Sequence, residues 1–135
     1  MLLTKKSEYA LLSLVSIARS NNPKNVDELS RELNIPKSFL AKIMQNLAKN
    51  DIVISQRGVN GGFILAKPYE ELTVLSITSA AEEKIPSVFE CSPSVDSCPS
   101  DVGSLCTLWP LLNNLQGKIN IFLEELTLKD IAQWH

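Results

Sequence analysis

The sequence predicts a mostly α-helical protein with one small β-hairpin, arranged as a winged helix-turn-helix domain followed by a long C-terminal helix. Three patterns predict this class: helix-like stretches joined by a tight turn at residues 34–36, strand-like runs around a glycine-rich turn at residues 57–62, and apolar residues at heptad spacing from 108 to 126. With 135 residues, 44% of them apolar, the chain can form one compact domain with an added element. We expect the domain to cover residues 1–84 and the added element residues 85–135.

The first expected helix lies near the N-terminus. The stretch from Tyr9 to Ala18 is apolar on nearly every side, is interrupted by two serines and is followed by Arg19 rather than by a small-residue cleavage site. We therefore expect a buried helix between the rest of the domain and the C-terminal helix, and not a signal peptide. No stretch reaches the roughly 18 apolar residues of a membrane span, so we expect a cytoplasmic protein with no membrane partner.

Residues 25–47 predict a short helix, a tight turn and a second helix. Asn25 followed by Glu28 is typical of a helix-starting capping box, and the turn ends at Pro36, which suits the first turn of the next helix. The apolar positions at helical spacing are Val26, Leu29 and Leu33 in the first helix and Leu40, Ile43, Met44 and Leu47 in the second. The other face of the second helix carries Lys37, Ser38, Ala41, Lys42 and Gln45. Two helices joined in this way predict a helix-turn-helix.

A β-hairpin follows. Residues 52–54 and 63–65 are strand-like runs, and Pro68 ends the second. Asn60 and Gly61 in the intervening turn tolerate positive φ, which favours a hairpin. A helix-turn-helix followed by a hairpin predicts a winged helix.

The net charge of −2 is the sum of two opposite halves. Residues 1–68 hold ten Lys and Arg against five Asp and Glu, which gives 10 − 5 = +5, whereas residues 69–135 hold three against ten, which gives 3 − 10 = −7. A basic half favours a polyanion as partner.

The polar residues of the second helix and the hairpin turn indicate double-stranded DNA as that polyanion. A helix fits the major groove, and an arginine at the base of a wing can enter a narrow minor groove. The candidate DNA-binding residues are Lys37, Ser38, Lys42, Gln45, Arg57 and Asn60. Solvated surface charges, or a winged helix that contacts another protein, are the alternatives.

All three cysteines lie in the stretch CSPSVDSCPSDVGSLC, as Cys91, Cys98 and Cys106. An odd number without a signal peptide favours a reducing compartment, in which the thiols are ligands or sensors. Thiolates suit iron-sulfur clusters or zinc, although this spacing matches no ferredoxin or zinc-finger run. A thiol-disulfide switch and three inert cysteines remain alternatives. We expect no enzyme, because Cys106 as a nucleophile would lack an internal histidine as its base.

The C-terminal segment predicts a dimer. Its apolar residues are spaced 4, 3, 4, 3 and 4 apart, the pattern of a coiled-coil seam: Leu108, Leu112, Leu115, Ile119, Phe122 and Leu126. Such a helix is expected to pair with its copy. The alternative is that it folds back on its own domain.

The segments MLLTKKSEYALLSL, IPKSFLAKIMQNLAKNDIVISQRGVNGGFILAKP and ELTVLSITSAAEE resemble the IscR and NsrR family of bacterial winged-helix transcription repressors. The resemblance spans nearly the whole chain. The family wing commonly has Pro-Gly where this chain has Val59 and Asn60, and Ala41 stands where some members carry a glutamate that affects operator choice. The operator sequence is therefore not carried over.

The resemblance implies a 2Fe-2S or 4Fe-4S cluster, because cluster-binding members carry cysteines at the positions of Cys91, Cys98 and Cys106. One branch uses a histidine three residues after the third cysteine, where this chain has Trp109. In the nitric-oxide-sensing branch the fourth ligand is instead a carboxylate directly before the tyrosine of the first helix, and it binds the cluster of the partner subunit. The resemblance therefore makes Glu8 the expected fourth ligand. A favourable charge in the first turn of a helix is the alternative for Glu8.

Overall fold

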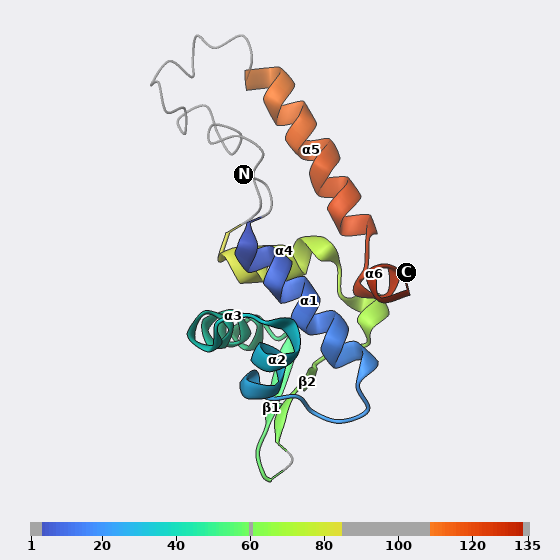
Figure 1. Cartoon of the computed structure of the whole chain (residues 1–135). Helices are drawn as coiled ribbons and strands as arrows, with labels where there is room; N and C mark the ends of the chain where they lie inside the picture. The colour runs from blue at the N-terminus through green and yellow to red at the C-terminus, as the bar shows by residue number, and fades with distance from the viewer. Residues whose placement is uncertain (1–3, 60, 85–108, 134–135) are drawn as a thin grey trace.

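The computed structural model describes residues 4–59, 61–84 and 109–133. These residues form α-helices, one 3-10 helix and one hairpin (Figure 1). The elements are α1 (Lys5–Arg19), α2 (Val26–Leu33), α3 (Lys37–Lys49), β1 (Val53–Gln56), β2 (Gly62–Leu65), η1 (Tyr69–Glu71), α4 (Val74–Glu82), α5 (Trp109–Glu125) and α6 (Leu128–Gln133). None of the helices in these ranges is long and apolar enough to cross a membrane.

Helix α1 begins at Thr4, whose hydroxyl oxygen accepts a hydrogen bond from the Lys6 amide at 3.2 Å. The same hydroxyl donates to the carboxylate of Glu82 and so joins the start of α1 to the end of α4. Helix α1 contacts α2, α3, α4, α6 and β2. The expected place of this helix, between the domain and the C-terminal helix, is wrong: α4, not α1, makes the main contact with α5. Helices α1 and α4 also contact each other, and small buried residues, Ala10 on α1 with Ala80 and Ala81 on α4, let them pack closely.

The helix-turn-helix is confirmed, although Pro36 stands at the N-cap of α3 and not inside its first turn. The side-chain oxygen of Asn25 accepts from the Glu28 amide at 2.8 Å, as the first half of a capping box requires. Asn34 ends α2 in the left-handed conformation with φ of 56°. The Ser30 hydroxyl donates to the carbonyl of Ile35 at 2.5 Å, and Ile35 is 3% exposed. The turn is therefore held both by hydrogen bonds and by burial.

Strands β1 and β2 form an antiparallel two-stranded sheet in which Val53 pairs with Leu65 and Gln56 with Gly62. The hairpin is confirmed, but the expected reason for it is wrong at Gly61. Positive φ occurs at Gly58, at +124°, and not at Gly61. Gly61 is needed for another reason, because a Cβ there would lie 2.5 Å from the carbonyl oxygen of Gln56. Asn60 lies outside the described residues.

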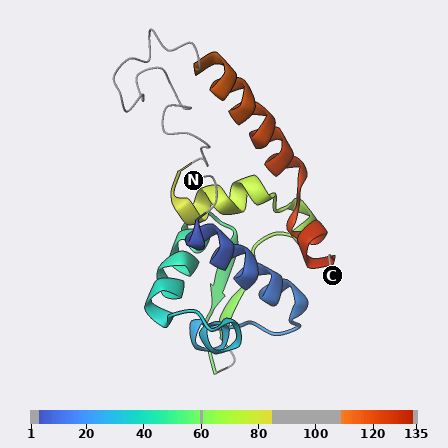
Figure 2. The same ribbon diagram turned by 45° about the horizontal axis from the view of Figure 1, so that its top comes forward.

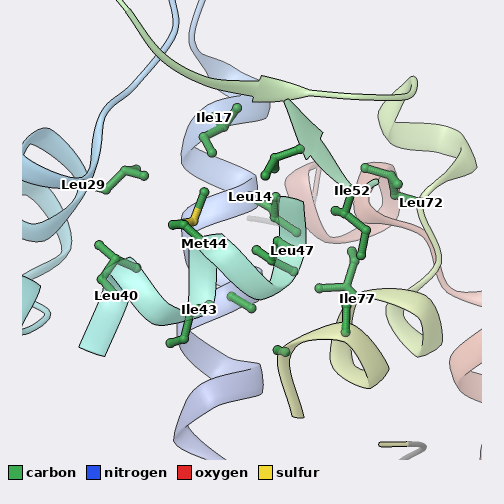
Figure 3. Packing of buried hydrophobic residues seen from close by; sticks show 14 of the residues in the cluster. Leu14, Ile17, Leu29, Leu40, Ile43, Met44, Leu47, Ile52, Leu72 and Ile77 are labelled. Carbon is green, nitrogen blue, oxygen red and sulfur yellow. The ribbon is translucent and has the colours of Figure 1, made fainter. Parts of the chain in front are cut away.

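The core lies where α1, α3 and α4 meet the base of the hairpin (Figure 3). Leu14 from α1, Leu47 from α3 and Ile77 from α4 are all fully buried. Helix α6 also contributes, because Leu128 is 0% exposed and Arg19 of α1 donates to the carbonyl oxygen of Ala132 at 2.6 Å. The division of the chain into residues 1–84 and 85–135 stays a prediction. Helix α6, which belongs to the second range, packs on α1, which belongs to the first.

Helix α5 extends away from the core in both views (Figures 1 and 2). It contacts α4, and Leu123 near its end is 5% exposed. Beyond α5 the chain returns to the core, where the Val74 amide donates to the carbonyl of Leu126 at 2.8 Å. This arrangement joins the C-terminal end of α5 to the domain.

Candidate nucleic-acid interface

The outer face of α3 is polar and open. Lys37, Ser38, Lys42 and Gln45 are all exposed, as expected for residues that contact DNA. The opposite face holds the helix in place, since Leu40, Ile43, Met44 and Leu47 are at most 1% exposed. A helix that buries one face completely presents the other as a rigid surface of donors.

Lys37 has an ion-pair partner that sequence reasoning missed. Its Nζ lies 2.6 Å from Oδ1 of Asp27, in the first turn of α2, and both side chains are more than half exposed. The hydrogen bond from Lys37, followed by its charge, lowers the pKa of Asp27 below its ordinary value of 3.8. The pair joins the starts of the two helices, and it brings an acidic group to the candidate interface.

The wing presents Arg57 directly after β1, with an exposed side chain. Val59 is fully exposed beside it, and Ile54 on β1 is 50% exposed. Arg57 therefore lies where the prediction put it, at the base of the wing turn. Figure 1 shows the hairpin extending away from the helical core, below α2 and α3. The other predicted wing residue, Asn60, lies outside the described part of the chain.

Glu8 lies in the first turn of α1, with its carboxylate 3.7 Å from Nζ of Lys5 and its side chain 58% exposed. Next to it, the ring of Tyr9 meets Phe39 of α3 edge to face, with ring centroids 5.6 Å apart. The Lys5 ammonium lies 5.7 Å from the centroid of the same Tyr9 ring. The aromatic pair ties the first turn of α1 to the start of α3, a contact between distant residues that no local sequence pattern indicates.

The other predicted metal ligands, Cys91, Cys98 and Cys106, lie outside the described residues. Within residues 4–59, 61–84 and 109–133, no group of three His, Cys, Asp or Glu side chains is arranged to hold a metal ion. The segment that carries the cysteines starts after Lys84. Lys84 lines the same open pocket as Thr4, Lys5 and Lys6, so this last described residue before the segment lies beside the start of α1.

The predicted dimerisation face on α5 is only partly covered by its own chain. Leu115 and Phe122 are 39% and 59% exposed, whereas Leu112, Ile119 and Leu126 are half-buried. Leu108 lies outside the described residues. The prediction missed Leu111, which is 63% exposed and lies on the same side as Leu115 and Phe122 at helical spacing.

Residues 3–133 match the sequence family described as "Rrf2: Iron-dependent Transcriptional regulator". The HTH-type transcriptional regulator IscR of Pectobacterium atrosepticum is 30% identical to this chain over 134 residues, which cover 98% of this chain and 79% of the relative. IscR of Yersinia pestis is 28% identical with the same coverage. The family and these relatives are transcriptional regulators, not enzymes.

The solved structure of CymR, the global cysteine regulator of B. subtilis, matches with a TM-score of 0.75 at 21% identity and covers 100% of this chain and 98% of its own. The structure of T. potens IscR matches with a TM-score of 0.72 at 19% identity and covers 100% of this chain and 93% of its own. These likenesses confirm the predicted winged-helix fold.

Proposed function

The chain belongs to the Rrf2 family of transcriptional regulators, and on that premise we propose that it is a homodimeric, sequence-specific repressor whose operator affinity is controlled by an iron-sulfur cluster. The family description is iron-dependent regulation, and the curated relatives quoted above carry the name IscR. The observation that carries the DNA-binding part is the outer face of α3, with its exposed polar side chains, opposite a completely buried apolar face.

In this proposal α3 enters the major groove and Arg57 enters the adjacent minor groove. Lys42 and Gln45 supply donors for phosphates and base edges, and Ser38 supplies a hydroxyl near the start of α3. The rigid attachment of α3 supports this role, because a backbone that is already fixed in place loses no further conformational freedom when it binds. A cytoplasmic location accompanies DNA binding.

Pairing of α5 with its copy would form the dimer. The exposed stripe of Leu111, Leu115 and Phe122 favours it, since a large apolar patch on a helix that extends from the core marks an interaction surface. A two-fold dimer would present two α3 helices to a pseudo-palindromic operator.

Cys91, Cys98 and Cys106 would hold the cluster, and Glu8 of the partner subunit would supply the fourth ligand. Three thiolates suit a 2Fe-2S or 4Fe-4S cluster, and the exposed carboxylate of Glu8 adds a harder oxygen donor. When bound, the cluster supplies iron centres whose ligands exchange in response to a small molecule. Glu8 lies next to Tyr9, which contacts Phe39, so a change at Glu8 has a direct route to α3.

The test of the cluster is to purify the chain without oxygen and measure iron, inorganic sulfide and zinc per protomer. The proposal expects a brown protein with iron and sulfide, and replacement of each cysteine by alanine should lower both. If the protein instead holds stoichiometric zinc and no sulfide, the cysteines form a zinc site. If it holds neither iron nor zinc, and a disulfide forms in air and changes DNA affinity, the cysteines act as a thiol-disulfide switch.

The test of Glu8 is the Glu8→Ala variant, with Glu28→Ala as a control that removes an exposed carboxylate from the first turn of another helix. We expect Glu8→Ala to fold and dimerise but to bind a cluster with an altered visible spectrum and a shorter lifetime in air. If Glu8→Ala keeps the cluster spectrum and lifetime of the parent protein, the fourth ligand lies elsewhere.

A further inference from the structure

The connection between α1 and α2 pairs with the wing through one isolated antiparallel β-bridge, between Lys24 and Phe63. The Lys24 amide donates to the carbonyl of Phe63 at 3.2 Å, and the Phe63 amide donates back to the carbonyl of Lys24 at 2.7 Å. Phe63 belongs to β2, the returning strand of the hairpin. A two-stranded hairpin is marginally stable alone, so this pairing attaches the wing to the helical domain.

Gly62 brings β2 directly onto the same backbone. A Cβ on Gly62 would lie 2.5 Å from the carbonyl carbon of Lys24 and 2.7 Å from its oxygen. No side chain fits in that space, because both neighbours are backbone atoms. The absence of a side chain at Gly62 thus lets Lys24 and Phe63 pair.

The side chain of Lys24 makes a second set of contacts, with the two helices. Its Nζ donates to Oγ of Ser16 in α1 at 2.9 Å and to Oε2 of Glu32 in α2 at 2.5 Å. The Ser16 hydroxyl in turn donates to Oε1 of Glu32 at 2.8 Å. Only 20% of the Lys24 side chain is exposed, and Ser16 is buried. The three side chains form a closed network, with each oxygen of the carboxylate bonded.

The hydrogen bond from Lys24, and next the one from Ser16, lower the pKa of Glu32 below its ordinary value of 4.5. Glu32 is therefore ionised at neutral pH. The network thus holds its charge-assisted bonds under ordinary conditions.

We infer that Lys24 is a positioning residue for DNA recognition, which fixes the wing relative to α3 through Phe63 on one side and through Ser16 and Glu32 on the other. The inference rests on the proposed binding of DNA by α3 and Arg57. Helix α2 joins α3 through a turn that is itself held by hydrogen bonds, so the position of Glu32 is also tied to that of α3. Groove contacts from two separate elements require a fixed spacing between them, and Lys24 contacts both the wing, through Phe63, and the helix that leads into α3, through Glu32.

The test compares Glu32→Gln with Glu28→Gln, two substitutions that each remove one carboxylate charge from α2. The probe is a labelled duplex selected by the parent chain from a randomised DNA library. Loss of a negative charge by itself raises affinity for DNA, so Glu28→Gln should bind equally well or better. Glu32→Gln should bind the duplex on the order of three- to tenfold more weakly, since the wing loses its fixed position. Affinity equal to or above that of Glu28→Gln would overturn the inference.

A second measurement separates positioning from a general loss of stability. If Lys24 positions the wing, Arg57→Ala should cost less affinity in the Glu32→Gln background than in the parent, whereas Lys42→Ala on α3 should cost the same in both. Equal costs of Arg57→Ala in both backgrounds would overturn the inference. Lys24→Met, which keeps the backbone pairing with Phe63, repeats the measurement if Glu32→Gln fails to fold, and Lys67→Met controls for the lost positive charge.

The outcomes also distinguish this inference from the proposed function. If neither Arg57→Ala nor Lys42→Ala weakens binding in the parent, the proposed interface is wrong and so is the inference that rests on it. If both weaken binding while Glu32→Gln and Lys24→Met leave it unchanged, the interface stands and only the positioning role of Lys24 is wrong.

Discussion

Helices α3 and α5 both carry a stripe of apolar residues, but the chain covers only one of these stripes. On α3 the stripe from Leu40 to Leu47 is at most 1% exposed, and the opposite face carries exposed polar side chains. On α5 the side chain of Leu123 is buried, while Leu111 and Phe122 stay 63% and 59% exposed. The outward face of α3 suits a hydrated polyanion, whereas that of α5 suits another apolar surface. The difference indicates that the two helices serve different partners.

The largest expected effect comes from a charge on the exposed stripe of α5. Phe122→Glu should convert the proposed dimer to a monomer, because a carboxylate buried in an apolar interface is strongly unfavourable. Operator affinity should then fall by on the order of a hundredfold, since the two recognition helices no longer bind as a linked pair. Analytical ultracentrifugation and a DNA titration at fixed salt measure the two effects.

Ile121→Glu is the matched control for Phe122→Glu. Ile121 is 58% exposed on the same helix, but it lies about 100° around the helix from Phe122. It should leave the dimer intact. A monomer produced by Ile121→Glu, or a dimer retained by Phe122→Glu, would contradict the assignment of the stripe.

The next prediction compares the same substitution on the two helices. Leu47→Ala should lower the free energy of unfolding by about 2 to 5 kcal/mol, because Leu47 is fully buried and its removal leaves a cavity. Leu111→Ala should act through the dimer, so that its effect on the melting temperature depends on protein concentration. Thermal unfolding at several concentrations checks both, and a concentration-independent effect of Leu111→Ala would contradict an interface there.

A smaller effect is expected at the wing. Arg57→Ala should cost about 1 to 3 kcal/mol of operator affinity if the guanidinium makes a well-formed groove contact. Lys67→Ala, which removes an exposed positive charge beyond the end of β2, is the control and should cost less. Equal affinities of Arg57→Ala and Lys67→Ala for the selected duplex would remove Arg57 from the interface.

The elements that the sequence predicted correctly are those with strong local signals. Helices α2 and α3 have apolar residues at helical spacing, α2 begins at a capping asparagine, and the hairpin has a glycine-rich turn between strand-like runs. Helices α4 and α6 were not predicted. The signal for α4 was nonetheless present, since the Thr73 hydroxyl oxygen accepts from the Ser76 amide at 3.1 Å and Val74, Ile77 and Ala81 are buried at helical spacing.

In the candidate interface, too, local features were predictable from the sequence and contacts between distant residues were not. The exposure of Lys42 and Arg57 was predictable, because helical period and turn chemistry place them on the surface. The partners of Lys24 were not predictable, since Phe63 is paired with it only in the folded chain and no local pattern links them. The Lys37 and Asp27 ion pair was missed for a similar reason: it depends on the angle between two helices.

The smallest expected effect concerns Asp27, the one acidic side chain paired with a residue of the α3 face among the described ion pairs. Asp27→Asn removes a negative charge near the phosphates and frees Lys37, but it also removes the carboxylate that orients this lysine. Pairs between exposed side chains contribute little, so the lost orientation should matter less than the lost repulsion, and operator affinity should rise by about two- to fivefold.

The dependence on salt and pH makes this last prediction specific. The gain from Asp27→Asn should shrink as salt is added, since screening weakens interactions between exposed charges. Lys37 holds the pKa of Asp27 below its ordinary value of 3.8, so the carboxylate stays charged at neutral pH and the ion pair is lost only as the pH falls through that lowered pKa. Glu28→Gln, in the same turn but without a contact to Lys37, isolates the effect of charge alone. A gain no larger than that of Glu28→Gln would mean that freeing Lys37 adds nothing, and a fall in affinity would mean that Asp27 orients Lys37 for binding rather than competing for it.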